Sequence, residues 1–277
     1  MRLLFAHATG FCGAVWRPVR EAVGEYPSTI FDFRGHGSSK SGRDRRSWWE
    51  MADDILAVRQ AMGETRPARV VGVGHSMGGA SLVMAELLSP GSFDALVLVE
   101  PIIFGPPFAR DPDHPLVGLA LRRRDTFESR DAVLASYASK PPFAAWDRAA
   151  LEGYVEGGFV EVDGVTQLAC RPTSEAEVFT AAGAHAAWER LSEVSTPTTI
   201  LYGANTDTYP PGHAEALAAR FGDATAAAVE DTGHFLPMER PEVVVAAVRE
   251  RIELLSESVR RVSRIGVQEN WRGARRR

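Results

Sequence analysis

The chain has 277 residues, 45% of them hydrophobic and 24% charged, with a formal net charge of −5 at pH 7. This length and composition predict one large globular core, or a core with an insertion, and they exclude a chain that is largely disordered. The acidic balance also disfavours a nucleic-acid-binding protein.

The cysteines and the apolar segments of the sequence indicate in which cellular compartment the protein is expected. The two cysteines, Cys12 and Cys170, lie far apart in the sequence and form no CxxC motif, so no disulfide framework is expected. The apolar run at residues 3–6 is too short for a signal sequence, and no later stretch approaches the roughly 20 apolar residues of a membrane span. We therefore expect a cytoplasmic protein.

Strand-like and helix-like segments alternate from the start of the chain. A strand at 3–7, a helix near 15–23 and a strand at 29–32 are followed by a helix that begins at Ser47. The spacing of Ser47 and Glu50 fits a capping box. Such alternation predicts a mostly parallel sheet covered by helices on both faces.

A serine stands at the apex of a strand, a sharp turn and a helix. The apolar run 69–73 leads into Gly74-His75-Ser76-Met77-Gly78, and a helix-prone stretch follows at 79–88. In this arrangement the turn exposes the serine hydroxyl, and the flanking glycines can carry no side chain. Ser76 is thus a candidate nucleophile. A dinucleotide-binding loop explains less, because the third glycine of that motif is missing.

After the apolar strand at 95–99, Glu100-Pro101 ends the regular alternation. Residues 102 to about 192 combine apparently helical segments with loops rich in proline and phenylalanine. We interpret this part as an insertion that roofs the nucleophile. Its aromatic residues either line an acyl pocket or form its own core; they are Tyr137, Phe143, Trp146, Tyr154 and Phe159.

A serine attacks an acyl carbon usefully only if a histidine takes its proton and an acid orients that histidine. His234 lies in a loop between a strand-like run at 226–229 and a final helix starting near Glu239. Asp207 follows the strand at 198–202. The order Ser76, Asp207, His234 therefore predicts a catalytic triad. Glu100 competes as the acid because it also ends a strand.

The other histidines are interpreted as structural. His7, His36 and His75 each lie in a turn motif, where hydrogen bonds that hold loops together are expected. No spacing among the histidines matches a metal-binding pattern, so no metal and no cofactor are expected.

Four segments together resemble the α/β-hydrolase superfamily over roughly residues 3–255. They are the serine turn, the Asp207 loop, the His234 loop and Asp32-Phe33-Arg34-Gly35-His36-Gly37-Ser38-Ser39. The resemblance implies an α/β-hydrolase core at 1–101 and 193–258 and a mainly helical lid at 102–192. It also implies an oxyanion hole formed by the backbone amides of Met77 and of Phe11 or a residue just before it. Most members have His-Gly where this chain has His7-Ala8.

The resemblance predicts a serine hydrolase. Its substrate would be a carboxylic ester, thioester or lactone of small to medium size and largely apolar character, cleaved through an acyl-enzyme. Alternatives within the fold are a C–C hydrolase, a lyase, a cofactor-free perhydrolase and a non-hydrolytic ligand-binding member. A serine at the elbow argues against haloalkane dehalogenase or epoxide hydrolase chemistry, which needs a carboxylate there.

The sequence also predicts features of the two ends of the chain. The resemblance begins at the third strand of the fold, so the first two strands are expected to be absent and strand 29–32 to form an open edge. Either the chain forms homo-oligomers through that edge or its natural start lies upstream of Met1. Residues 259–277 contain seven arginines and one acid, a formal charge of +6 that leaves −11 for the remainder. We interpret this segment as a flexible tail that binds no specific nucleic acid.

Overall fold

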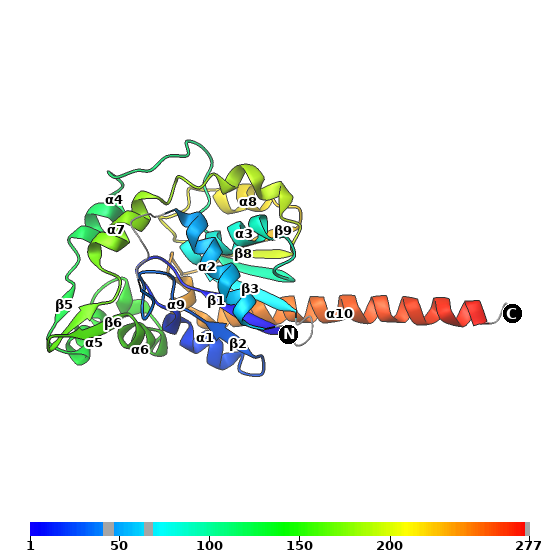
Figure 1. The fold of residues 1–277 in the computed structure, drawn as a ribbon, viewed down its shortest axis with the longest axis horizontal. Helices are drawn as coiled ribbons and strands as arrows, with labels where there is room; N and C mark the ends of the chain where they lie inside the picture. Colours follow the sequence, from blue (N-terminus) through cyan, green and yellow to red (C-terminus); the bar gives the residue numbers. More distant parts are fainter. Residues whose placement is uncertain (41–46, 64–68, 275–277) are drawn as a thin grey trace.

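The computed structural model describes residues 1–40, 47–63 and 69–274, and the side chains up to residue 257. Its centre is a parallel sheet of six strands (Figure 1). In spatial order these are β2 (Ser28–Ile30), β1 (Arg2–Ala6), β3 (Val70–His75), β4 (Ala95–Val99), β8 (Thr198–Gly203) and β9 (Ala224–Val229). The predicted parallel sheet is confirmed, and β2 lies at its edge as expected.

The centre of the sheet is buried on both faces, because β3 and β4 are almost entirely apolar and every one of their residues is buried. Leu3 and Phe5 of β1 join one core cluster, whereas Leu4 and Ala6 join the other. This division follows from the alternation of side chains across a strand. A strand that must be buried on both sides therefore reads as a continuous apolar run.

Each core cluster is completed by helices. One face packs on the 3₁₀ helix η1 (Gly13–Trp16), α1 (Arg17–Ala22) and α10 (Pro241–Ala274). The opposite face packs on α2 (Trp48–Ala61), α3 (Met77–Leu88) and α8 (His213–Ala218). The capping box at the start of α2 is present: Oγ of Ser47 accepts from the Trp49 amide and Glu50 accepts from the Ser47 amide.

The chain between β4 and β8 forms the insertion, which lies on the left of Figure 1. Its helices are α4 (Pro115–Leu121), α5 (Arg130–Ala138), η2 (Phe143–Ala145), α6 (Arg148–Gly157), α7 (Pro172–Thr180) and η3 (Ala187–Glu193). It also holds an antiparallel sheet of β5 (Thr126–Phe127), β7 (Val165–Leu168) and β6 (Phe159–Val162). The sequence interpretation missed this sheet, although Asp163-Gly164 between alternating residues signals a hairpin, and both residues have positive φ.

The end of the chain differs from its expected form. Helix α10 continues from Pro241 to Ala274 and leaves the body of the molecule (Figure 1). The segment predicted to be a flexible tail is thus helical up to Ala274. Arginine is a good helix former, so a basic composition does not by itself oppose a helix. The side chains of its arginines lie outside the described part of the chain.

Candidate active site

Ser76 stands at the tight turn between β3 and α3. Its backbone has φ 55° and ψ −118°, a region that non-glycine residues rarely adopt. The turn is fixed by the Ser76 amide, which donates to the carbonyl of Val99 on the neighbouring strand at 2.9 Å. The predicted strand, turn and helix are therefore present, and they hold the serine in a strained conformation of the kind that recurs at reactive sites.

The glycines around Ser76 are required by close backbone contacts. A Cβ on Gly78 would lie 2.3 Å from the carbonyl oxygen of Ala6 and 2.6 Å from that of His7. A Cβ on Gly74 would lie 2.8 Å from the backbone of Gly78. The turn therefore forms only because these positions carry no side chain.

We expect Gly78→Ala to prevent stable folding or to remove several kcal/mol of stability, because the atoms in the way belong to a central strand and cannot move aside. Gly79→Ala is the matched control. Its nearest neighbour would be the side chain of Pro101 at 3.1 Å. Thermal unfolding of both variants measures the difference, and equal melting temperatures would contradict the steric argument.

His234 is held by Glu100. Its Nδ1 lies 2.7 Å from Oε2 of Glu100, which follows β4 directly and is fully buried. A carboxylate can only accept, so Nδ1 carries a proton and donates it to this hydrogen bond. Glu100 is itself fixed by the Gly203 amide at 2.9 Å and by the hydroxyl of Thr206 at 2.8 Å. Its φ of 42° is a second strained position at a strand end.

The carboxylate beside His234 belongs to Glu100 and not to Asp207, the predicted acid. Asp207 is exposed, and in the described part of the chain no hydrogen bond or ion pair joins it to His234. The strands that precede Glu100 and Asp207 are neighbours, so both residues lie at the same edge of the sheet. The Asp207 loop reaches the site through Thr206 instead, a residue that the sequence interpretation missed.

His75 connects the histidine loop to the serine turn. Its Nε2 donates to the backbone carbonyl of His234 at 2.8 Å, and the two rings lie 4.8 Å apart. Burial lowers the pKa of His75 well below its usual value, and the neighbouring His234 lowers it further. His75 is therefore a neutral residue that holds His234 beside the residue preceding Ser76, in agreement with its predicted structural role.

The expected oxyanion donors are the amide of Met77 and that of Phe11 or a residue just before it. The amide of Met77 opens α3 and has no partner within the helix. The amide of Phe11, the other expected donor, is occupied by the carbonyl of Ala8 at 3.2 Å. The Gly10 amide donates to Nε2 of His36 at 3.0 Å. Among the described residues the Thr9 amide has no acceptor, and its hydroxyl contacts the sulfur of Met77 at 3.4 Å. The Thr9 amide is therefore available as a second donor.

His7 and His36 hold this loop in place. His7 Nε2 accepts from the Phe33 amide at 3.1 Å, and Nδ1 donates to the carbonyl of Ala8 at 2.8 Å. His36 links the Gly10 amide to the carbonyl of Arg34. Burial lowers the pKa of His36 to about 3 and also lowers the pKa of His7. Both rings are thus neutral in the folded protein.

These buried histidines predict an acid-sensitive fold. In the unfolded chain each of these histidines has its ordinary pKa near 6.5, whereas in the folded chain the pKa is lower for His7 and far lower for His36 and His75. The neutral histidines therefore contribute fully to the free energy of unfolding above pH 6.5. As the pH falls below this value, the free energy of unfolding decreases by up to about 1.4 kcal/mol per pH unit for each histidine. Urea unfolding between pH 7.5 and 4.5 measures this. A constant midpoint across that range would contradict it.

An aromatic cluster from the insertion lies next to His234. The rings of Trp146 and Tyr154 pack on Phe11 at 5.2 and 5.1 Å, and Trp146 packs on Phe235 at 5.7 Å. Phe235 follows His234, so the cluster borders the histidine loop. Trp146 and Tyr154 are buried. The insertion therefore contributes to an apolar wall beside the loop that carries His234.

Across residues 1–40, 47–63 and 69–274 no group of three histidine, cysteine or acidic side chains is arranged to hold a metal ion. In the same part of the chain no helix combines the length and the apolar character that crossing a membrane requires.

Known proteins share this fold and part of this sequence. A type I acyl-CoA thioesterase of Penicillium roqueforti is 33% identical over 105 residues, which are 36% of this chain and 24% of that protein. The chain thus matches only about a quarter of this relative's length. A peroxisomal alpha-beta-hydrolase of Saccharomyces cerevisiae superposes with a TM-score of 0.79 at 20% identity, over 92% of this chain and 76% of that one.

An esterase of Mycobacterium tuberculosis superposes with a TM-score of 0.67 at 21% identity, over 91% of this chain and 84% of that one. At such identities these likenesses establish the fold alone. The model of the alpha/beta hydrolase family matches residues 3–247, nearly the whole folded body around Ser76, Glu100 and His234. The chain therefore belongs to the alpha/beta hydrolase family.

Proposed function

We propose that the protein is a serine hydrolase that cleaves a carboxylic ester, thioester or lactone through an acyl-enzyme. The observation that carries the proposal is the placement of Ser76 and His234. Ser76 has a strained backbone and follows His75, whose ring packs on His234. The Nδ1 of His234 is fixed by a fully buried carboxylate. Relatives named esterase and thioesterase support this class of reaction.

In the proposed mechanism, Nε2 of His234 removes the proton of Ser76 as its Oγ attacks the carbonyl carbon. Glu100 holds the imidazole in the Nδ1-protonated form and stabilises the imidazolium that results. Glu100 takes the role first expected of Asp207. The negative oxygen of the tetrahedral intermediate is held by the amides of Met77 and Thr9, each donor contributing on the order of 3 kcal/mol.

Breakdown of this intermediate completes the cycle. His234 gives its proton to the leaving oxygen or sulfur, and an acyl group remains on Ser76. Water, deprotonated by His234, then attacks the acyl carbon and releases the acid. All groups needed for these steps are side chains and amides of this chain, so the proposal requires no cofactor.

The apolar cluster of Phe11, Trp146, Tyr154 and Phe235 supports a substrate with an apolar body of small to medium size. We place the insertion, residues 102–192, as the lid over the core. The unpaired, buried Cys12 and Cys170 suit a reducing compartment, and a cytoplasmic location is part of the proposal.

A fluorophosphonate probe tests the proposal, because it labels only an activated serine. We expect labelling of the intact protein at Ser76, together with hydrolysis of 4-nitrophenyl butyrate. A protein that is labelled but cleaves no ester or thioester would instead be assigned to the C–C hydrolases, lyases or perhydrolases. A folded protein that is not labelled would be a ligand-binding member, and the proposed function would be wrong.

A further inference from the structure

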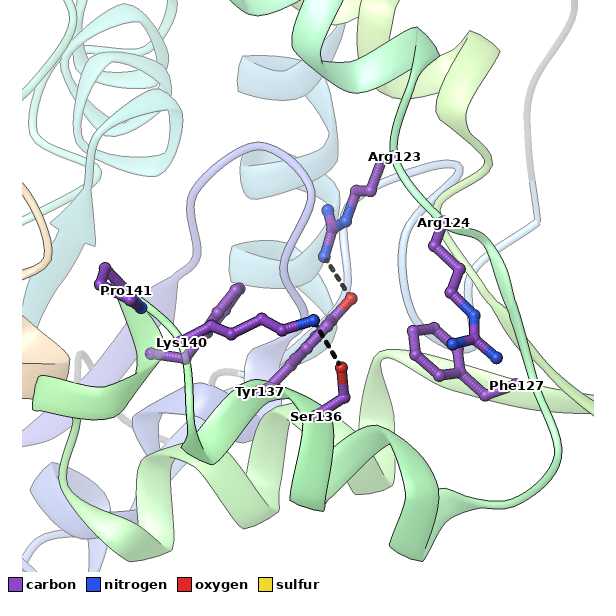
Figure 2. A pocket seen from close by; sticks show the side chains of 8 residues that line it. Arg123, Arg124, Phe127, Ser136, Tyr137, Lys140 and Pro141 are labelled. Carbon is purple, nitrogen blue, oxygen red and sulfur yellow. Dashed lines mark hydrogen bonds between the residues drawn. The ribbon is translucent and has the colours of Figure 1, made fainter.

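The insertion contains a pocket of about 220 Å³ that is lined by basic and aromatic residues (Figure 2). Its cationic side chains are Arg123, Arg124 and Lys140, and no acidic side chain lines it. A site for a whole drug-sized ligand usually exceeds about 300 Å³. The pocket is therefore large enough for one end of a ligand but not for a whole drug-sized molecule.

Two of the three cations lack a compensating charge. In the described part of the chain neither Arg124 nor Lys140 forms an ion pair with a carboxylate. Nζ of Lys140 contacts only the hydroxyl of Ser136, at 3.4 Å. Nε of Arg124 donates to the carbonyl of Thr126, and its guanidinium stacks 4.3 Å above the ring of Phe127. The stacking fixes the plane of Arg124 while leaving its terminal N–H groups available.

Arg123, the third cation of the pocket, has a compensating carboxylate. It is paired with Glu175, whose two carboxylate oxygens lie 3.1 and 3.0 Å from Nη1. Its Nη2 donates to the hydroxyls of Tyr137, at 3.4 Å, and Tyr154. The Tyr137 hydroxyl accepts this bond and so keeps its own proton to donate. Figure 2 shows the hydrogen bonds from Lys140 to Ser136 and from Arg123 to Tyr137. Lys140, Arg124, Tyr137 and Ser136 thus offer several donors and two net positive charges.

The pocket adjoins the aromatic wall of the candidate active site. The ring of Phe143 lines the pocket, stacks on Tyr137 at 4.4 Å and packs on Trp146 at 4.8 Å. Trp146 in turn contacts Phe11 and Phe235. The Tyr154 hydroxyl, bonded to Arg123, also donates to the carbonyl of Gly10, the residue after Thr9. One layer of rings thus connects the basic pocket to the groups around Ser76.

We propose that this pocket binds the anionic end of the substrate, a carboxylate or a phosphate, while the acyl carbon lies at Ser76. Charge-assisted hydrogen bonds to an oxyanion are the interaction for which an uncompensated lysine and a stacked arginine are suited. The inference rests on the proposed hydrolase function and adds the substrate class to it. The substrate has an apolar middle that runs along the aromatic wall.

Matched substrates distinguish the two sources of negative charge. 4-Nitrophenyl butyrate is neutral, and 4-nitrophenyl hydrogen glutarate adds a carboxylate to the acyl side. S-Butyryl-N-acetylcysteamine is a neutral thioester, and butyryl-coenzyme A adds phosphates to the leaving side. We expect Lys140→Gln or Arg124→Gln to raise KM about tenfold for one of the anionic substrates and to leave kcat unchanged. A tenfold change in affinity corresponds to the loss of one charge-assisted hydrogen bond. The neutral partner of that substrate should be unaffected.

The controls are the same exchanges made elsewhere. Lys40→Gln removes the only other lysine, which lies outside the insertion, and Arg148→Gln removes an exposed arginine of α6 that does not line the pocket. Neither should change KM for the anionic substrate. Equal KM changes for charged and neutral substrates, or none for either anionic substrate, would overturn the proposal.

A binding measurement separates failure of this inference from failure of the hydrolase function. Calorimetric titration of the intact protein with glutarate and with inorganic phosphate needs no turnover. We expect one of them to bind, and the double variant Lys140→Gln, Arg124→Gln to lose that binding. If wild type hydrolyses no substrate yet shows this loss, the pocket is an anion site and the hydrolase proposal alone fails. Binding that survives in the double variant refutes the pocket.

Discussion

Ser76→Ala is expected to reduce kcat for 4-nitrophenyl butyrate by at least about a thousandfold, since the residual rate then comes only from substrate binding and the oxyanion hole. The substitution removes one oxygen atom at a strained turn and leaves the backbone hydrogen bond from residue 76 to Val99 in place. The fold should persist, with the same circular dichroism and a similar melting temperature. A loss below about a hundredfold would rule out Ser76 as the nucleophile.

Ser81→Ala is the control for this experiment. Ser81 is also buried, lies one turn further along α3, and its hydroxyl donates to the carbonyl of Met77 at 2.8 Å. Removing that hydroxyl costs about 1 kcal/mol of stability but touches no reacting atom. We expect Ser81→Ala to keep its activity and its fluorophosphonate labelling, whereas Ser76→Ala loses both.

Glu100→Gln is expected to lower kcat on the order of a thousandfold with little change in KM. The amide that replaces the carboxylate can donate to His234, which favours the wrong tautomer and leaves the imidazolium without its counter-charge. Asp207→Asn is the matched exchange on the competing acid. Because Asp207 is exposed and does not contact His234, its variant should retain nearly full activity.

The comparison of these two variants decides the identity of the acid. Glu100→Asp adds a second check, because it restores the charge but shortens the side chain, so partial recovery is expected. If Asp207→Asn shows the larger drop in turnover, the acid is Asp207 and the hydrogen bond between Glu100 and His234 is merely structural. Steady-state kinetics on 4-nitrophenyl butyrate provides the measurement.

The sequence predicts the central part of the fold because local signals there agree with the tertiary structure. Each of these signals has its own physical cause. They are the apolar runs that become β3 and β4, the capping box at Ser47 and the glycines around Ser76. Asp163-Gly164 is also a hairpin signal, but the neighbouring segments have a helical pattern, so the hairpin is not predicted. The full length of helix α10 is not predicted either, because a basic composition also fits a disordered tail.

The acid and the oxyanion donor could not be read from local sequence. Glu100 and Asp207 both follow strands that end at the same edge of the sheet, so their order along the chain does not separate them. The choice depends on backbone direction at Glu100, where φ is 42°, and on two hydrogen bonds from the β8 loop. Which amide near Phe11 is available depends on the hydrogen bond from the Phe11 amide to Ala8, a detail of one short turn.

Helix α6 of the insertion is joined to the core more tightly than a flap would be. Gly153 lies so close to η1 that a Cβ there would come within 2.1 Å of the carbonyl oxygen of Ala14, and the Asp147 amide donates to the carbonyl of Met238 at 2.6 Å. Tyr154 and Trp146 share one apolar cluster with β1 and β3. Opening α6 would expose that cluster, so its local unfolding free energy approaches that of the whole molecule. We therefore expect α6 and the core to unfold together, and we expect the proposed hydrolase to exchange its substrate without detachment of this helix.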